Sequence, residues 1–437
     1  MTYGENYIET AATEKDWINS PSASSNITSV TLSDGTVIEA ENGGVLTLVI
    51  DSYQYDILDF LETGDPLPDG SEEQGSYSFE TTAGTVAASE MGKFMNMAGQ
   101  TAQYTYRSAL KVGAEGIDET ETIPPMLARV EQVDATHMEN GQLNAYGPFF
   151  NGVIADSAPF QIKNVHIIGV GDGANDFQGE AAMVLSQGSA DVTLEDSLIE
   201  TLGVIRTAAA VKDNGILRIK NSVIYTEETA DTQEEYDALV VPMMKRTPFA
   251  LGLEGTVRAT NVLGAGQGIY TDSLIVSSGW GVLSTDSGNA YDWVGTYALD
   301  VKDTVAGTGR VEYVRDGVEY FATKEVCGMP MGYIPGGSGY VAYADSGVRD
   351  RFENVRFYGG NEVQIMASAN SSAFYYDSEL TSGHIGVMTQ QNAGGTIHIE
   401  NSSLNVGETG VQIKSGAAND GYTNVELVAA NVSFRSE

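Results

Sequence analysis

The sequence predicts an all-β protein, a right-handed parallel β-helix with an irregular N-terminal cap and with loop and hairpin insertions. Two observations predict it. The chain has 50 Gly and only 11 Pro among 437 residues, with Val, Ile, Thr and Tyr in short alternating runs that are typical of strands. Strand-like segments also recur at a nearly constant interval, which is the mark of a repeat fold.

The repeating segment is a strand of about five residues that ends in a turn rich in Gly, Asn, Asp and Ser. The last three intervals between its first valines are 22, 24 and 24 residues. Each turn of a coiled sheet contributes two or three short strands that pair in parallel with the turns above and below, so a period near 24 fits such a coil. The aligned valines are Val204, Val282, Val341, Val363, Val387 and Val411.

A second strand column follows the first and contains an Asn or Asp at a corner between two strands. Asn and Asp tolerate the left-handed backbone of such a bend, and the Asn amide can donate to the residue one coil away. The predicted corners are Asp196, Asn221, Asn261, Asn354, Asn401 and Asn431. A β-propeller would need hairpin turns at most joints, and the sequence contains few.

The chain is predicted to divide into an N-terminal cap with irregular β structure, residues 1–141, and a β-helix, residues 142–437. The open end of a coil must be covered, which explains the cap. Two insertions are expected, near 225–247 and 310–338. In the second, Asp316-Gly317 lies between two alternating runs and predicts a two-residue hairpin turn.

Charge and cysteine content limit the partners. A net charge of -38 without a Lys/Arg cluster argues against nucleic acid, and no apolar stretch approaches the roughly 18 residues of a membrane span. Cys327 is the single cysteine, so an intrachain disulfide is impossible. The expected partner is a carbohydrate or a small-molecule substrate. Location is left open, with the cell exterior or surface slightly favoured over the cytoplasm, and so is the oligomeric state.

The coil repeat and the corner residues, from about Gln142 to the end, resemble the right-handed parallel β-helix, or pectate-lyase-like, superfamily. The resemblance is one of architecture. It implies that polysaccharide lyases, glycoside hydrolases, epimerases, carbohydrate esterases and non-catalytic adhesins are all candidate functions.

Asp286 and Asp345 are the candidate catalytic residues. Each stands at the fifth position of its strand and is followed by Ser-Gly. If the two coils are neighbours, the two Cα atoms stack about 5 Å apart, and mutual repulsion raises the pKa of one carboxyl so that it can act as a general acid. The alternative is that each Asp only caps its own turn. His384 is a third candidate, because it precedes the same strand column.

Candidate binding residues surround this pair. Trp280, Trp293 and Tyr343 offer aromatic faces for a flat ligand, and Lys245 and Arg246 offer cations. Asp172, Asn175, Asp176 and Glu180 offer oxygen ligands for calcium, although a polar Gly-rich turn explains them as well. No other cofactor is expected.

The leading hypothesis is therefore a β-helix enzyme that acts on a glycan or glycoside-like substrate by carboxylate acid/base chemistry, as a hydrolase or a lyase. One alternative is a non-catalytic surface or adhesion protein. Another is a cofactor-free isomerase or lyase of a small non-sugar molecule.

Overall fold

The computed structural model describes residues 6–11, 29–31, 37–39, 45–50, 78–81, 84–87, 105, 106, 108–119, 121, 122, 124–146, 151–171, 173, 176, 179, 181–229, 256–286, 297–345, 347–367, 371–389, 394–413 and 424–436. The predicted all-β class is confirmed over this part of the chain. Apart from a single 3-10 turn, η4 (Pro124–Leu127), the described elements are strands. Among the residues that the structure describes, no helix is long and apolar enough to cross a membrane.

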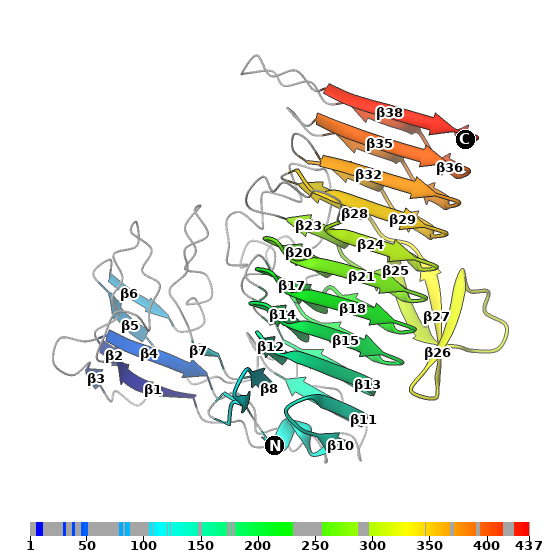
Figure 1. The fold of residues 1–437 in the computed structure, drawn as a ribbon. Coiled ribbons are helices and arrows are strands. Elements are labelled where there is room, and N and C mark those ends of the chain that lie inside the picture. The colour runs from blue at the N-terminus through cyan, green and yellow to red at the C-terminus, as the bar shows by residue number, and fades with distance from the viewer. Residues whose placement is uncertain are drawn as a thin grey trace.

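Two long sheets dominate the fold (Figure 1). The 11-stranded sheet contains β8 (Ser108–Gly113), β9 (Gly116–Ile117), β12 (Asn151–Asp156), β14 (Val184–Gln187), β17 (Ala209–Val211), β20 (Arg258–Leu263), β23 (Gly281–Asp286), β28 (Tyr340–Asp345), β31 (Glu362–Met366), β34 (Ile385–Thr389) and β37 (Thr409–Ile413). The 21-stranded sheet contains β10 (Arg129–Val133), β11 (His137–Tyr146), β13 (Pro159–Val170), β15 (Asp191–Glu195), β16 (Leu198–Leu202), β18 (Ile216–Lys220), β19 (Val223–Glu227), β21 (Gln267–Thr271), β22 (Leu274–Ser277), β24 (Leu299–Lys302), β25 (Val305–Tyr313), β26 (Ala322–Val326), β27 (Met329–Pro335), β29 (Arg349–Glu353), β30 (Arg356–Gly359), β32 (Ser371–Tyr376), β33 (Glu379–Ser382), β35 (Gly394–Glu400), β36 (Ser403–Val406), β38 (Asn424–Ala430) and β39 (Ser433–Ser436).

Two smaller sheets precede them in the chain. One has the order β1-β4-β7, with β1 (Asn6–Ala11), β4 (Val45–Ile50) and β7 (Thr105–Tyr106). The other has the order β3-β2-β5-β6, with β2 (Ser29–Thr31), β3 (Val37–Glu39), β5 (Ser78–Thr81) and β6 (Gly84–Ala87).

Successive turns of the chain stack on one another. One strand of the 11-stranded sheet is followed by two of the other sheet, as in β14, β15 and β16, and each pairs in parallel with its counterpart in the next turn, β17, β18 and β19. The same rule links β20, β21 and β22 to β23, β24 and β25. Figure 1 shows these strands stacked in chain order from β12 to β38. Long parallel sheets built in this way are compatible with a β-helix.

The register confirms that the turns containing Asp286 and Asp345 are neighbours. β23 and β28 pair directly, with Leu283 opposite Ala342 and Asp286 opposite Asp345. Two other alignments were wrong. Val204 lies before β17, and in that turn it is Ala209 that pairs in register with Thr260 of β20. Val363 aligns with Gly386 rather than with Val387, because Gln364 is the partner of Val387.

A turn of the chain gives two consecutive strands to the 21-stranded sheet, and the corner between them adopts the left-handed backbone conformation. Five predicted corners are confirmed by φ angles from 43° to 53°: Asp196, Asn221, Asn354, Asn401 and Asn431. Asn221 donates from Nδ2 to Asp196 Oδ1 at 2.6 Å, which links consecutive coils. Asn261 is the exception. It is buried inside β20, and Asp272 (φ 46°) forms the corner of that turn.

A buried hydroxyl follows each of several corners and ties the coils together. The Ser222 hydroxyl donates to the Lys220 carbonyl at 2.7 Å and accepts from the backbone N–H of Ser197 at 3.2 Å. The Thr304 hydroxyl does the same for Lys302 and Ser273. Buried backbone groups must find partners, so this column satisfies N–H groups that the tight corner removes from the sheet ladder.

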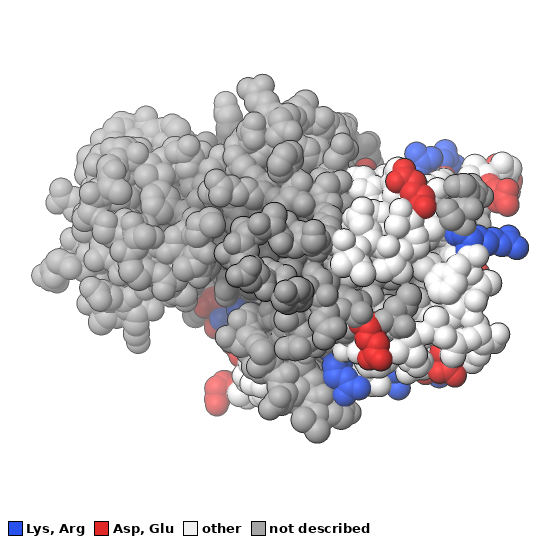
Figure 2. All heavy atoms as spheres, turned by 90° about the horizontal axis from the view of Figure 1, so that it is seen from above, with Lys and Arg blue, Asp and Glu red and all other residues white. Residues whose placement is uncertain are grey.

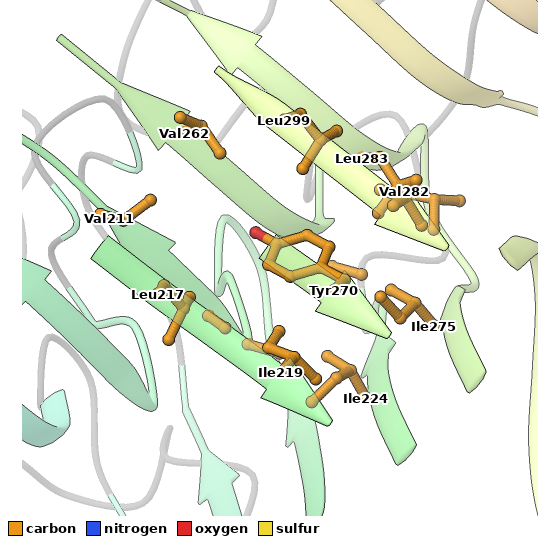
Figure 3. Packing of buried hydrophobic residues seen from close by; sticks show 14 of the residues in the cluster. Val211, Leu217, Ile219, Ile224, Val262, Tyr270, Ile275, Val282, Leu283 and Leu299 are labelled. Atoms are coloured by element: carbon orange, nitrogen blue, oxygen red, sulfur yellow. The ribbon is translucent and has the colours of Figure 1, made fainter. Parts of the chain in front are cut away.

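Alternation along each strand separates the interior from the surface. In β29, Asp350 and Phe352 are buried, while Arg349, Arg351 and Glu353 are half-buried on the outer side. Apolar side chains from both sheets meet in the interior, as Figure 3 shows for part of the hydrophobic cluster. They include Val211, Leu217, Ile219, Val262, Tyr270, Val282 and Leu299.

An antiparallel extension leaves the coils between β25 and β28. β27 pairs with both β25 and β26, and the hairpin turn is Cys327–Gly328, with φ angles of 51° and 70°. The predicted hairpin at Asp316-Gly317 is therefore wrong. Met331 and Tyr333 of β27 bury their side chains beside Val311, whereas Val318 after the Asp-Gly turn stays exposed. Of the other expected insertion, near 225–247, residues 230–247 lie outside the described residues.

Candidate functional site

A buried arginine of the 11-stranded sheet joins two carboxylates, one from the same sheet and one from the segment before β14. Arg258, at the start of β20, donates from Nε to Asp176 Oδ2 at 2.7 Å and from Nη1 to Asp286 Oδ2. All three side chains are at most 8% exposed. Because buried charge is costly unless it is paired and hydrogen-bonded, the three groups depend on one another for their place in the fold.

A pair of aromatic rings packs on one side of the guanidinium. The Arg258 guanidinium carbon lies 5.3 Å from the centre of the Trp280 ring, and Trp280 meets Tyr340 edge to face at 5.6 Å. The Tyr340 hydroxyl lies 2.7 Å from Ser284 Oγ. Gly281 makes this possible, because a Cβ there would overlap the Tyr340 ring. The rings shield the ion pairs from water, which strengthens their electrostatics.

The pKa of the Asp286 carboxyl is raised toward neutral pH. Burial raises its pKa to about 6, with Asp345 and Asp176 adding to the rise and Arg258 opposing it. Asp345, its register partner, is only half-buried. A carboxyl with a raised pKa beside a more accessible carboxylate is the arrangement that acid/base catalysis uses. The sequence prediction that these two residues meet on adjacent strands is confirmed.

His384 does not join them. It stands just before β34, where Ile385 aligns through Glu362 with Tyr340, at the opposite end of the strand from Asp345. Its side chain is 53% exposed, and its Nδ1 lies 2.9 Å from Glu408 Oε1. His384 precedes the same strand column, as the sequence indicated, but this puts it at the start of the strands, whereas Asp286 and Asp345 stand at their ends.

The predicted aromatic platform has a different role for the residues that the structure describes. Trp280 is 1% exposed and packs against Arg258, so its faces are not open to a ligand. Tyr343 is 8% exposed and contacts Tyr340, with ring centres 5.3 Å apart. Trp293, Lys245 and Arg246 lie outside the described residues.

Of the four predicted calcium ligands, only Asp176 is described. Its Oδ2 accepts from Arg258, and a guanidinium at that oxygen occupies the place that a cation would need. Asp172, Asn175 and Glu180 lie outside the described residues. Among the residues that are described, no three His, Cys, Asp or Glu side chains gather as a metal-binding group.

Sequence reasoning missed Arg258, Tyr340 and Ser284. Arg258 lies 82 residues after Asp176 and 28 before Asp286, and no local pattern connects them. One signal was present, since an Arg inside an otherwise uncharged strand segment, VRATNVL, needs a buried partner. In the described part of the face that Figure 2 shows from above, acidic and basic side chains are interspersed.

No known protein-family profile matches the sequence. No curated protein matches it either. Among solved structures, the chain is similar to the catalytic domain of a GH87 alpha-1,3-glucanase, a variant in complex with nigerose, at 8% sequence identity and a TM-score of 0.17. The likeness covers 69% of this chain and 63% of that one, which is less than two thirds of its length.

Proposed function

We propose that the chain is a right-handed parallel β-helix that cleaves a glycosidic or glycoside-like bond with Asp286 and Asp345. The stacked three-strand turns support the architecture, and parallel crossovers are right-handed in about 98% of cases. The observation that carries the proposed chemistry is the register pairing of two carboxylates, one of which has a pKa raised to about 6.

The spacing favours a retaining mechanism. Neighbouring parallel strands lie about 4.7–4.9 Å apart, close to the roughly 5–5.5 Å that separates the two carboxyl groups of retaining glycosidases. Asp286 would donate its proton to the leaving oxygen as Asp345 attacks the anomeric carbon. Asp286, now ionised, would then take a proton from the water that breaks the glycosyl-enzyme bond. Arg258 is a positioning residue that holds Asp286 Oδ2.

The test is a depolymerisation screen against neutral α- and β-glucans, xylan and mannan, read by new reducing ends. Wild type is expected to cleave at least one polymer. Asp286→Asn and Asp345→Asn should each lower the rate by about 10²-fold or more, the usual worth of one acid/base group. Asp316→Asn, at an exposed residue of the antiparallel extension, is the matched control and should leave the rate unchanged.

One observation favours a second candidate, a non-catalytic surface protein. Asp286 is 8% exposed and shares Arg258 with Asp176, which is how a purely structural ion-pair network looks. Inactivity of the folded wild type across the whole screen would favour this reading and contradict the enzymatic one.

A further inference from the structure

Half-buried aromatic and cationic side chains form a strip on the outer face of the 21-stranded sheet. In β32, Phe374 and Tyr376 alternate with buried residues, so both point outward. Arg351 pairs in register with Phe374, and Phe374 with His398, one residue from each of three consecutive coils. We define the aromatic strip as Tyr297, Arg349, Arg351, Phe374, Tyr376 and His398. It lies on a different sheet from Asp286 and Asp345.

The rings of the strip touch without covering one another. Tyr297 and Phe374 have ring centres 6.1 Å apart at an interplanar angle of 72°. His398 is tilted by 36° against Phe374 and by 42° against Tyr376. No neighbouring ring of the strip is stacked flat on these faces, and the Arg349 guanidinium lies over one face of the Phe374 ring.

The two arginines are held in place before any ligand arrives. Arg351 forms two hydrogen bonds to Asp300, at 2.8 and 2.6 Å, and its guanidinium carbon lies 4.9 Å from the Tyr297 ring centre. The guanidinium carbon of Arg349 lies 5.3 Å from the centre of the Tyr297 ring and 5.4 Å from the centre of the Phe374 ring. A guanidinium fixed in this way loses little freedom on binding, so its remaining N–H groups are preorganised donors.

The charges of the strip argue for an uncharged ligand. Asp300 neutralises Arg351, and Glu400 lies 3.1 Å from His398. The net charge of -38 opposes the approach of a polyanion. Aromatic faces beside fixed polar donors suit a ligand that is apolar on one side and rich in hydroxyl groups at its edges, as a neutral sugar ring is.

We propose that the aromatic strip binds an extended neutral polysaccharide. Sugar rings lie with their C–H faces on Phe374 and Tyr376, and Arg349 and Arg351 donate to hydroxyl oxygens. The strip presents a ring or guanidinium at each step of about 4.7–4.9 Å between coils, so the polymer follows the stacking direction. This surface binds without turnover and does not depend on the carboxylate pair being catalytic.

The experiment is native affinity electrophoresis in gels that contain soluble β-glucan, xylan or galactomannan, with polygalacturonate as the anionic counterpart. Wild type should be retarded by at least one neutral polymer. Phe374→Ala and Tyr376→Ala should each weaken the Kd about 3- to 10-fold, the worth of one aromatic contact, while Phe374→Trp retains binding. Tyr313→Ala removes a 52% exposed ring elsewhere and is the matched control.

Thermal melting checks that each variant is folded. The proposal is overturned if no neutral polymer retards wild type, if only polygalacturonate does, or if folded Phe374→Ala and Tyr376→Ala migrate as wild type does. Asp286→Asn separates this surface from the proposed active site. Unchanged retardation of that variant supports the strip, and lost retardation places the binding at the carboxylates instead.

Discussion

Arg258 and Asp286 form a buried ion pair between neighbouring strands of the 11-stranded sheet, and the same guanidinium also holds Asp176. Replacing Arg258 with Met leaves two buried carboxylates without their counter-ion. The free energy of unfolding should fall by about 3–5 kcal/mol, the usual cost of breaking a buried pair. Urea denaturation measures it.

Two further variants make this test specific. Arg258→Lys keeps the charge but cannot reach both carboxylates in the fork geometry of a guanidinium, so it should recover only part of the loss. Arg356→Met is the control, because that side chain is 45% exposed and lies 4.5 Å above the Phe321 ring. A loss below about 1 kcal/mol in Arg258→Met would show that the pair is not a structural anchor.

The corner column offers a test of backbone strain. Asn354 has φ 52° and donates to Asp303 Oδ1 at 2.6 Å. Asn354→Ala loses both the tolerance for this backbone and the hydrogen bond, and should lower the free energy of unfolding by about 1–2 kcal/mol. Asn354→Gly restores only the backbone and should cost less. Equal losses in the two variants would mean that strain at the corner is unimportant.

Asp350 gives a prediction about pH. It is buried inside the coil, where its Oδ2 lies 3.1 Å from Thr285 Oγ1, and burial raises its pKa well above the ordinary value. The folded chain therefore keeps a proton that the unfolded chain releases above about pH 4. The stability linked to Asp350 is complete below that pH and is lost, by about 1.4 kcal/mol per unit, as pH rises toward the folded pKa.

Asp350→Asn removes this dependence. The variant should gain stability relative to wild type between pH 4 and pH 7, as measured by denaturation at several pH values. Asp316→Asn, at an exposed carboxyl, should show no such trend. A difference between wild type and Asp350→Asn that is constant with pH would contradict a buried neutral carboxyl.

The repeat made much of the fold predictable, because a period near 24 residues and a corner Asn arise from the geometry of a coil. The pairing of Asp286 with Asp345 followed from their equal places in two similar strands, each followed by Ser-Gly, and from treating the segment between the strands as an insertion. Local signals failed where distant packing decides. Asn261 matched the corner pattern but is buried in β20. Asp316-Gly317 matched a hairpin turn, but β25 pairs with β27, where the side chain of Tyr333 is buried.

The candidate site was predictable only in part. The two aspartates could be aligned by the similar strands that contain them. Arg258 meets Asp176 through a contact 82 residues apart that no spacing reveals. Trp280 was expected at a ligand surface and is buried instead, because its ring covers the guanidinium. Sequence pattern indicates which residues share a face, and the ion pairs then decide which of them stay accessible.

The most direct test of the carboxylate pair is the titration of Asp286 itself, followed by ¹³C NMR of labelled aspartate and assigned with Asp286→Asn. The carboxyl should titrate near pH 6, being protonated and able to act as an acid below that value. In Asp345→Asn the midpoint should move to lower pH, because a neighbouring negative charge has been removed. Titration of Asp286 near pH 4 in wild type, or a midpoint unaffected by Asp345→Asn, would contradict the coupled pair on which the proposed function rests.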